Sequence, residues 1–286
     1  MEQSLEQAKV LLNGAYDLHM HAAPSPFNRL MDDFSLLQEA GDAGMAGIML
    51  KSHYEPTAAR AQLVNAHGCS DATAYGGIVL NWPVGGLNPY AVENALKRDA
   101  KIVWMPTRDS KNSLYAGDMP GDFFSREGIT IFAEDGSLKP VVLEIMEIVK
   151  KYDAAMATGH LSPKESITLC REGVHRGVRM VLTHPEFDRT VVDAQTQKDL
   201  AGMGVYIEKC WYNIAERNCT AEEMTEHIRV VGPEHCYLCT DRGQGNREHP
   251  VDAMVHFISA LLEFGITENE IKTMTQNVPQ RVLGLH

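Results

Sequence analysis

Short apolar segments alternate with amphipathic segments along the chain, and this alternation is typical of parallel strands connected by helices. Each apolar segment runs into polar or small residues, where we expect the strand to stop. The segment 32–43 illustrates the helical pattern, because Phe34, Leu37 and Ala40 recur at helical spacing before Gly44. The predicted strands end near residues 21, 51, 80, 105, 160, 185, 208 and 241.

The segment 106–140 interrupts this alternation because it is long and irregular. Within it, residues 129–132 and the pair Asp135-Gly136 predict a small β-hairpin with a tight turn. Long loops that follow the strands of a parallel sheet are often functional, so the segment is a candidate lid over a binding site. A surface excursion with no role in binding is an equal alternative.

The composition is that of an ordinary globular protein, with 44% hydrophobic and 22% charged residues among 286. A formal net charge of -12 disfavours nucleic acid and anionic membranes as partners. The first residues lack the basic and apolar regions of a secretory signal, and no apolar stretch approaches the ~18 residues of a membrane span. We therefore expect a cytoplasmic protein that acts on a small molecule, and the sequence leaves a homo-oligomer open.

The cysteines predict no special chemistry. Six cysteines in a chain of this length are typical of reduced thiols rather than of a disulfide framework. Cys236 and Cys239 form a C-x-x-C pair, but they lie in a segment with the pattern of a buried strand. Neither a helix N-terminus nor a second pair accompanies them, so core packing is favoured over redox chemistry or metal binding.

The segment 17–21, with the sequence Asp-Leu-His-Met-His, contains the clearest chemical signal. Residues i and i+2 of a strand face the same side, so His19 and His21 point together at the C-terminal end of the first strand. Two neutral imidazoles fit an apolar core poorly but suit a divalent cation. The pattern therefore favours a metal site, provided that later strands supply further ligands.

Three later strand ends do carry such residues. They are His160 in Thr-Gly-His, His184 in Thr-His-Pro and Asp241 in Thr-Asp-Arg. Together with His19 and His21, their order along the chain resembles the ligand set of the amidohydrolase superfamily.

The resemblance covers nearly the whole chain, and it implies the fold and the cofactor. We expect a single (β/α)8 TIM-barrel domain over residues 1–286, with the lid or hairpin inserted at about 106–140. The five matching residues would hold one or two divalent cations. Zinc is the first expectation, with manganese or iron as alternatives.

The fourth strand departs from the superfamily pattern. It ends in Trp104-Met105-Pro106, without the lysine or glutamate that bridges two metals in many members. Lys51 lies instead at the end of the second strand, where it shares a face with His53. Lys51 is interpreted as a displaced carboxylated metal bridge, as a cation for a substrate anion, or as a partner of a metal ligand. A bridging or cationic role is favoured over a structural one.

Glu208, at the end of the seventh strand, is a second unusual residue. Its carboxylate is interpreted as a metal ligand, a proton shuttle or a partner of Lys51 across the mouth of the barrel. A carboxylate that only neutralises charge at a polar barrel end is an equal alternative.

The resemblance implies a metal-dependent hydrolase that activates water to cleave an amide, ester, lactone or related bond. Asp241 would accept a proton from that water and pass it to the leaving group, with Lys51 and Glu208 as further catalytic candidates. Positively charged side chains in the predicted loops after the strands favour a small anionic substrate. The candidates for binding it are Arg29, His53, Arg108 and Arg242.

Two alternatives stay open. A metal-dependent decarboxylase or another lyase fits the same residues, because the superfamily includes non-hydrolytic members with the same ligands. A non-catalytic metal-binding barrel is less favoured, because loss of activity requires a change in only one ligand and this chain retains them all.

Overall fold

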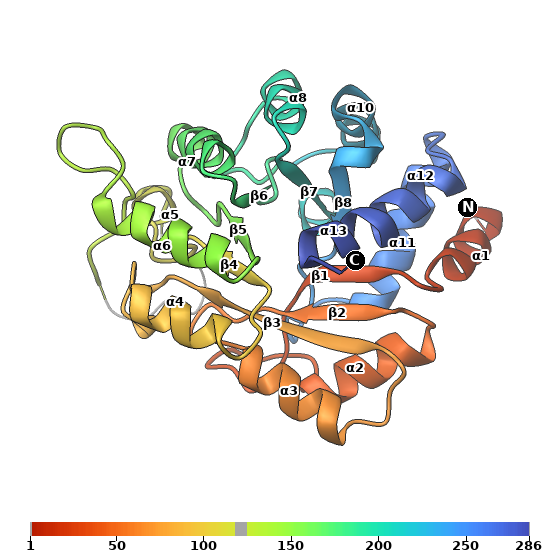
Figure 1. The fold of residues 1–286 in the computed structure, drawn as a ribbon. Helices are drawn as coiled ribbons and strands as arrows, with labels where there is room; N and C mark the ends of the chain where they lie inside the picture. The colour runs from red at the N-terminus through yellow and green to blue at the C-terminus, as the bar shows by residue number, and fades with distance from the viewer. Residues whose placement is uncertain (1, 118–124, 286) are drawn as a thin grey trace.

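The computed structural model describes residues 2–117 and 125–285, which form eight parallel strands surrounded by helices (Figure 1). The strands neighbour one another in chain order, and each pairs in parallel with the next. This arrangement is the predicted (β/α)8 TIM barrel. The strands are β1 (Tyr16–Met20), β2 (Gly47–Leu50), β3 (Thr73–Val79), β4 (Ile102–Trp104), β5 (Ala155–Ala157), β6 (Arg179–Leu182), β7 (Tyr206–Cys210) and β8 (Cys236–Cys239).

Every connection between consecutive strands carries at least one helix. Local capping explains two of the helix starts. Asp32 accepts a hydrogen bond from the Ser35 N–H before α2, and Ser162 forms a capping box with Glu165 at the start of α7. Among the described residues, no helix combines the length and the apolar character needed to cross a membrane. The helices are α1 (Glu2–Leu11), α2 (Asp33–Asp42), α3 (Ala58–His67), α4 (Pro89–Leu96), α5 (Lys111–Tyr115), α6 (Pro140–Lys151), α7 (Pro163–His175), α8 (Ala194–Gly202), α9 (Trp211–Ala215), α10 (Ala221–Val231), α11 (Pro250–Glu263), α12 (Glu268–Lys272) and α13 (Val278–Leu283).

Two apolar clusters stabilise the barrel. The larger cluster lies between the sheet and the surrounding helices. The smaller one fills the barrel interior and includes Leu18, Trp104 and Tyr237. The last helix, α13, adds Val278 and Val282 to the interior cluster, together with residues from the first positions of the strands. Apolar packing therefore closes the end of the barrel where the strands begin, and the other end is left for polar side chains.

β1 and β8 meet at the seam of the barrel through few backbone contacts. The Asp241 N–H donates a hydrogen bond to the His19 carbonyl oxygen (2.9 Å). The buried Asp17 carboxylate accepts hydrogen bonds from the Thr240 N–H (3.3 Å) and hydroxyl (2.6 Å), and from the His19 N–H (3.0 Å). The seam therefore holds His19 and Asp241 in a fixed relation, although they lie near opposite ends of the sequence.

The segment 106–140 contains the predicted hairpin. Phe132 and Leu138 pair in an antiparallel bridge on either side of a tight turn. Residues 118–124 of the predicted lid lie outside the described part of the chain. Of the described residues in this segment, only Arg108 lines the cavity at the barrel mouth. The role as a lid stays a prediction.

Candidate metal centre

A cavity of about 550 Å³ opens at the end of the barrel where the strands end. Active sites of (β/α)8 barrels form at this face, because the loops after all eight strands meet there. The lining residues that lie one to three residues after a strand end are His21, His53, His160, His184 and Asp241. The remaining lining residues are Phe27, Asn28, Arg29, Arg108, Phe187, Tyr212, Gln244, Gly245, Asn246 and Arg247.

His19, His21 and Asp241 form a compact group of ligand atoms. Asp241 Oδ1 lies 3.2 Å from His19 Nε2 and 2.9 Å from His21 Nε2. The three ligand atoms all lie within 4.8 Å of one another. The other ring nitrogen of His21, Nδ1, lies 2.8 Å from the Lys51 carbonyl oxygen, which leaves Nε2 for the centre of the group. The structure thus brings together the residues predicted from the two ends of the chain, and their binding of a metal stays a prediction.

His160 and His184 lie beside this group. The His184 ring centre is 5.8 Å from that of His19 and 5.0 Å from that of His160. In both residues Nδ1 is buried and has no hydrogen-bond partner among the described residues. Burial lowers the pKa of His184 to about 4 and that of His160 well below its ordinary value, so both rings are neutral. Neutral imidazole nitrogens without a partner are suited to bind a cation.

Negative charge is concentrated around His19. Its Nδ1 lies 3.1 Å from Glu208 Oε1, and its Nε2 faces Asp241. Burial disfavours the protonated ring, yet Asp241 and Glu208 raise the His19 pKa to about 9. A position where two carboxylates stabilise a proton also suits a metal cation.

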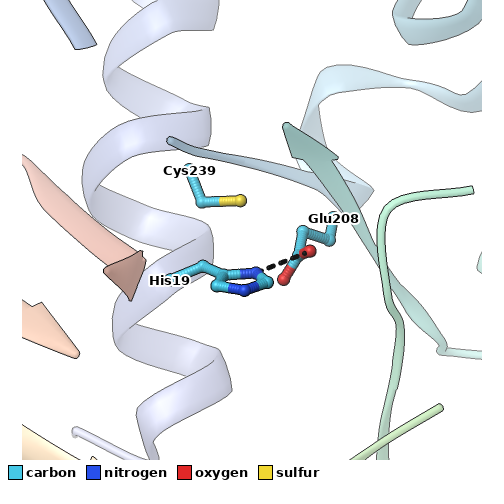
Figure 2. Close-up of side chains that lie close together, drawn as sticks. All are labelled: His19, Glu208 and Cys239. Carbon is cyan, nitrogen blue, oxygen red and sulfur yellow. Dashed lines mark hydrogen bonds and ion pairs between the residues drawn. The ribbon is translucent and has the colours of Figure 1, made fainter. Parts of the chain in front are cut away.

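Glu208 orients His19 from the barrel interior (Figure 2). Its Oε1 also accepts a hydrogen bond from the His184 N–H (3.2 Å), and its Oε2 accepts one from the Tyr237 hydroxyl (2.7 Å). Burial alone would raise the Glu208 pKa, but His19 lowers it to about 2, so the carboxylate is ionised. A carboxylate bound to Nδ1 fixes the tautomer and the orientation of an imidazole whose Nε2 is a metal ligand.

Cys236 and Cys239 do not form a joint site. The Cys239 thiol lies near His19 and Glu208 in the barrel interior, and these three groups are a second candidate ligand set (Figure 2). Cys236 belongs to the cluster between the sheet and the helices. Burial raises the pKa of Cys239 well above its ordinary value. Since the thiolate and not the thiol binds metals, the group that contains Asp241 is the better candidate.

Lys51 directly follows β2, and its side chain reaches the centre of the ligand group. Its Nζ lies 2.8 Å from His19 Nε2 and 5.3 Å from the centre of the Trp104 ring. Burial lowers the Lys51 pKa, and the nearby carboxylates of Asp241 and Glu208 oppose this effect. Lys51 is absent from the lining of the cavity. Its position favours a role at the metal centre over direct contact with a substrate.

His53 lines the cavity and is held by residues that the sequence analysis did not single out. Its Nδ1 lies 2.8 Å from the Thr107 hydroxyl oxygen. Asn81 donates hydrogen bonds to that same oxygen (2.7 Å) and to the His53 carbonyl oxygen (3.0 Å). Because the Thr107 oxygen accepts from Asn81, its proton is available to His53 Nδ1. Burial lowers the His53 pKa well below its ordinary value, so the ring is neutral and one of its two nitrogens carries no proton.

Arg242 does not reach the site predicted for it, whereas Arg29 and Arg108 do line the cavity. The Arg242 guanidinium is buried and pairs with Glu216 (3.4 Å) and Glu248 (3.3 Å). A buried guanidinium between two carboxylates is already neutralised, so Arg242 serves the structure of the loop after β8.

The aromatic lining of the cavity was missed by the sequence analysis. Phe27 lies in the loop after β1, and Phe187 and Tyr212 follow β6 and β7. A signal was present for Phe187, since it lies three residues after His184 in the same loop. Apolar residues in loops are common, however, and only the folded chain distinguishes those that line a cavity.

Comparisons with known proteins agree with the fold. Residues 14–208 match a sequence family described as "Family of unknown function (DUF6282)". No curated protein matches the chain. Among solved structures, an amidohydrolase from Pseudomonas aeruginosa matches 98% of this chain and 98% of its own, with 13% identity and a TM-score of 0.64.

Two further solved structures are similar. A 2,6-dihydroxybenzoate decarboxylase from Rhizobium matches 96% of this chain and 99% of its own, with 14% identity and a TM-score of 0.55. A TatD homologue from Escherichia coli K12 matches 96% of this chain and 100% of its own, with 14% identity and a TM-score of 0.56. At this identity the likeness establishes the (β/α)8 barrel fold alone, which is the fold that the sequence predicts.

Proposed function

The chain belongs to the DUF6282 family, whose function is not known. From the geometry of the site we propose that the protein is a metal-dependent hydrolase of the amidohydrolase type. Its substrate is a small molecule with an amide, ester, lactone or related bond. One observation carries the proposal: His19, His21 and Asp241 present three ligand atoms within 4.8 Å of one another beside a cavity. Imidazole and carboxylate donors at this spacing suit zinc, with manganese or iron as alternatives.

The neighbouring residues support a cation at this point. His160 and His184 offer buried Nδ1 atoms that lack a partner among the described residues, and they are available to the same cation or to a second one. The carboxylates around His19 stabilise positive charge there. When bound, a divalent cation supplies Lewis acidity, which lowers the pKa of water and polarises a carbonyl or phosphoryl group.

Asp241 is the proposed general base. Its side chain is 15% exposed, whereas His19 and His21 beside it are 0% and 2% exposed. Burial would raise the Asp241 pKa, but the two imidazoles hold it well below its ordinary value. The carboxylate is therefore ionised at the edge of the cavity, where it accepts a proton from water and passes it to the leaving group.

In this proposal Glu208 and Lys51 contact the His19 ring and do not contact the substrate. Both Glu208 oxygens accept hydrogen bonds from protein groups, so Glu208 is a positioning residue. Lys51 is either a carboxylated bridge between two cations or a charge that balances the nearby acids. A carboxylated Lys51 makes the folded protein heavier by the mass of one CO₂, so mass spectrometry distinguishes the two roles.

Elemental analysis combined with native mass spectrometry tests the proposal. We expect about one or two divalent cations per chain, lost in the double variant His19→Ala/His21→Ala and retained in the exposed control Asp71→Asn. A panel of amides, esters and lactones should be turned over by the loaded protein, and a chelator should stop the reaction until metal is added back. Folded protein that binds no divalent cation would refute the proposal.

The same panel separates the two enzyme classes. Carboxylated substrates are added, and CO₂ release is measured beside hydrolysis. Metal-dependent CO₂ release without hydrolysis of any panel member would reject the hydrolase and support the decarboxylase alternative.

A further inference from the structure

Two loops at the mouth of the barrel are joined by a short antiparallel pairing. The Leu30 N–H, in the loop after β1, donates to the Gly243 carbonyl oxygen in the loop after β8 (3.0 Å). The Gly245 N–H donates in the opposite direction, to the Asn28 carbonyl oxygen (3.1 Å). Gly243 permits this approach, because its φ of 121° suits glycine and a Cβ there would overlap the His21 carbonyl oxygen. The two loops therefore hold each other in place before any ligand arrives, which reduces the entropic cost of binding.

Arg29 and Gln244 are opposite each other in this pairing. The two backbone hydrogen bonds lie on either side of them, so they form the non-hydrogen-bonded pair of an antiparallel ladder. In such a pair the opposite side chains are closest together and point to the same face. Both residues line the cavity. The backbone pairing thus places a guanidinium beside a side-chain amide at the cavity wall.

The Gln244 amide has an acceptor without a donor. Its Nε2 donates to the Asp241 carbonyl oxygen (2.8 Å), which fixes the orientation of the amide. Its Oε1 is buried and has no hydrogen-bond partner among the described residues. Buried polar atoms of folded proteins are nearly always paired, so this oxygen is suited to accept from an N–H or O–H of a ligand.

The Arg29 guanidinium forms no ion pair with any residue that the structure describes. Its Nε donates to the Ser25 hydroxyl (3.3 Å), and its carbon lies 5.8 Å from the centre of the Phe27 ring. Asp241 is the only acid among the described lining residues, and it contacts two imidazoles. Burial lowers the Arg29 pKa to about 10, which leaves the group charged at neutral pH. Its terminal N–H groups are therefore suited to bind an anion.

We propose that Arg29 and Gln244 bind a carboxylate that carries an N–H or O–H donor on the neighbouring carbon, as N-acyl amino acids and 2-hydroxy acids do. Arg29 donates to the carboxylate oxygens, and Gln244 Oε1 accepts from the neighbouring donor. The inference rests on the proposed function, since it names the substrate class of the same site. The cavity of about 550 Å³ is of the size that small-molecule ligands occupy.

NMR titrations of metal-free protein test the proposal without using catalysis. N-acetylglycine and N-acetylsarcosine differ only in the methyl group that replaces the N–H. Glycolate and methoxyacetate differ in the same way at oxygen, and the amides of N-acetylglycine and glycolate lack the negative charge. We expect at least one of the two donor-bearing acids to bind about fivefold more tightly than its methylated partner and about tenfold more tightly than its amide.

Each outcome of these titrations decides a part of the proposal. A preference in only one of the two pairs would restrict the donor to nitrogen or to oxygen. Equal binding of the methylated acids, equal binding of the amides, or no binding of either donor-bearing acid would overturn the proposal.

Variants assign the two interactions to the two residues. Gln244→Met should abolish the preference for the unmethylated acid, whereas a preference caused by steric exclusion of the methyl group would survive this substitution. Arg29→Met should weaken the methylated and unmethylated acids alike, by about tenfold, and leave the amides unchanged. Circular dichroism checks that each variant is folded. A preference that persists in Gln244→Met, or acid binding that is unaffected in Arg29→Met, would overturn the assignment.

Arg247→Met and Asn246→Ala are the matched controls. Both residues line the same cavity, but Arg247 pairs with Glu216 (2.8 Å), and Asn246 lies outside the paired positions of the two loops. We expect changes below about threefold in both controls. Losses equal to those in Arg29→Met and Gln244→Met would contradict a specific role of the pair.

The failure of this inference is distinguishable from the failure of the proposed function. Metal-dependent turnover in a protein that binds none of these acids would retain the hydrolase and reject the carboxylate site. Acid binding that depends on Arg29 and Gln244, in a protein that takes up no metal, would do the reverse.

Discussion

Two buried sites on opposite faces of β7 both combine a lysine with a glutamate. Glu208 faces the barrel interior, and the next residue, Lys209, faces the helices, as alternation along a strand requires. Both side chains are fully buried. Burying charge is costly in either place, so the difference between the sites lies in how the charges are compensated.

In the outer site the charges compensate one another. Lys209 Nζ lies 2.5 Å from Glu186 Oε1 and 2.6 Å from Gln197 Oε1, and His227 Nδ1 lies 3.1 Å from the same Glu186 oxygen. Burial would raise the Glu186 pKa, but Lys209 and His227 lower it. The pair connects β7 with the loop after β6, and all of these contacts of Glu186 go to its Oε1, while its Oε2 is buried without a hydrogen-bond partner among the described residues.

In the inner site the charged groups converge on an imidazole instead of on each other. Glu208 contacts Nδ1 of His19, and Lys51 contacts Nε2 of the same ring. Asp241 lies against the same Nε2 and borders the cavity. Buried charge alone therefore does not distinguish the two sites. The proposed functional site differs in that its charged groups converge on ligand atoms beside a cavity.

The largest effect is expected for Asp241→Asn. The amide cannot accept a proton, so kcat should fall by about 10²–10⁴-fold while the fold stays intact. Steady-state kinetics and circular dichroism measure the two effects. Asp71→Asn, an exposed acid, is the control. Turnover close to that of the wild type would remove Asp241 from the mechanism.

Lys209→Met should lower the free energy of unfolding by about 3–5 kcal/mol, because it leaves the buried Glu186 carboxylate without its ion pair. Lys51→Met should spare stability and remove turnover, because we propose that Lys51 acts at the metal centre. Urea unfolding and kinetics separate the two effects. The double variant Lys209→Met/Glu186→Leu should regain most of the lost stability. A reversal of these outcomes would invalidate the contrast between the two sites.

Glu208→Gln should weaken metal binding about 10–100-fold, because the amide orients the His19 ring less strongly than the carboxylate does. Competition with a chromophoric chelator measures the affinity. Glu186→Gln is the matched control, since it changes a buried glutamate outside the barrel interior. Equal losses of metal affinity in both variants would indicate a general structural effect instead.

The smallest effect concerns pH. The Glu186 pKa is lower in the folded chain than its ordinary value of 4.5, so its contribution to stability is present above that value and is lost as the pH falls through the folded pKa. The difference in unfolding free energy between wild type and Glu186→Gln should therefore be constant above about pH 5 and shrink in acid. Urea unfolding at several pH values measures it. A difference that grows as the pH falls would contradict the pairing with Lys209.

Local signals predicted most of the fold, and the errors lie at strand ends. Ser162 begins α7 as a cap, because its side chain satisfies a free N–H whatever surrounds the helix. The predicted fifth strand reached His160, but β5 ends at Ala157. Gly159 adopts φ = 60°, a left-handed conformation that turns the chain away from the sheet. The strand therefore stops before the residues that serve the site.

The sequence predicts which residues lie at the strand ends of the candidate site. It does not predict which partners their side chains contact. His160 and His184 could be assigned to one rim, because parallel strands in a barrel end at the same face. The sequence predicts a substrate-binding role for Arg242 because it is a positively charged residue in the predicted loop after the eighth strand. Its side chain turns instead to Glu216 and Glu248, on segments whose proximity the sequence does not reveal.

The amino-acid sequence by itself determined the barrel and the residue types of the proposed metal site, because hydrophobic periodicity and strand-end positions are local properties that repeat along the chain. Only the tertiary structure decided which charges are already compensated. Lys51 and Lys209 are both lysines at or near the end of a strand, yet one contacts His19 and the other Glu186. The energy of a buried charge depends on the atoms within a few ångströms of it, and folding alone brings those atoms together.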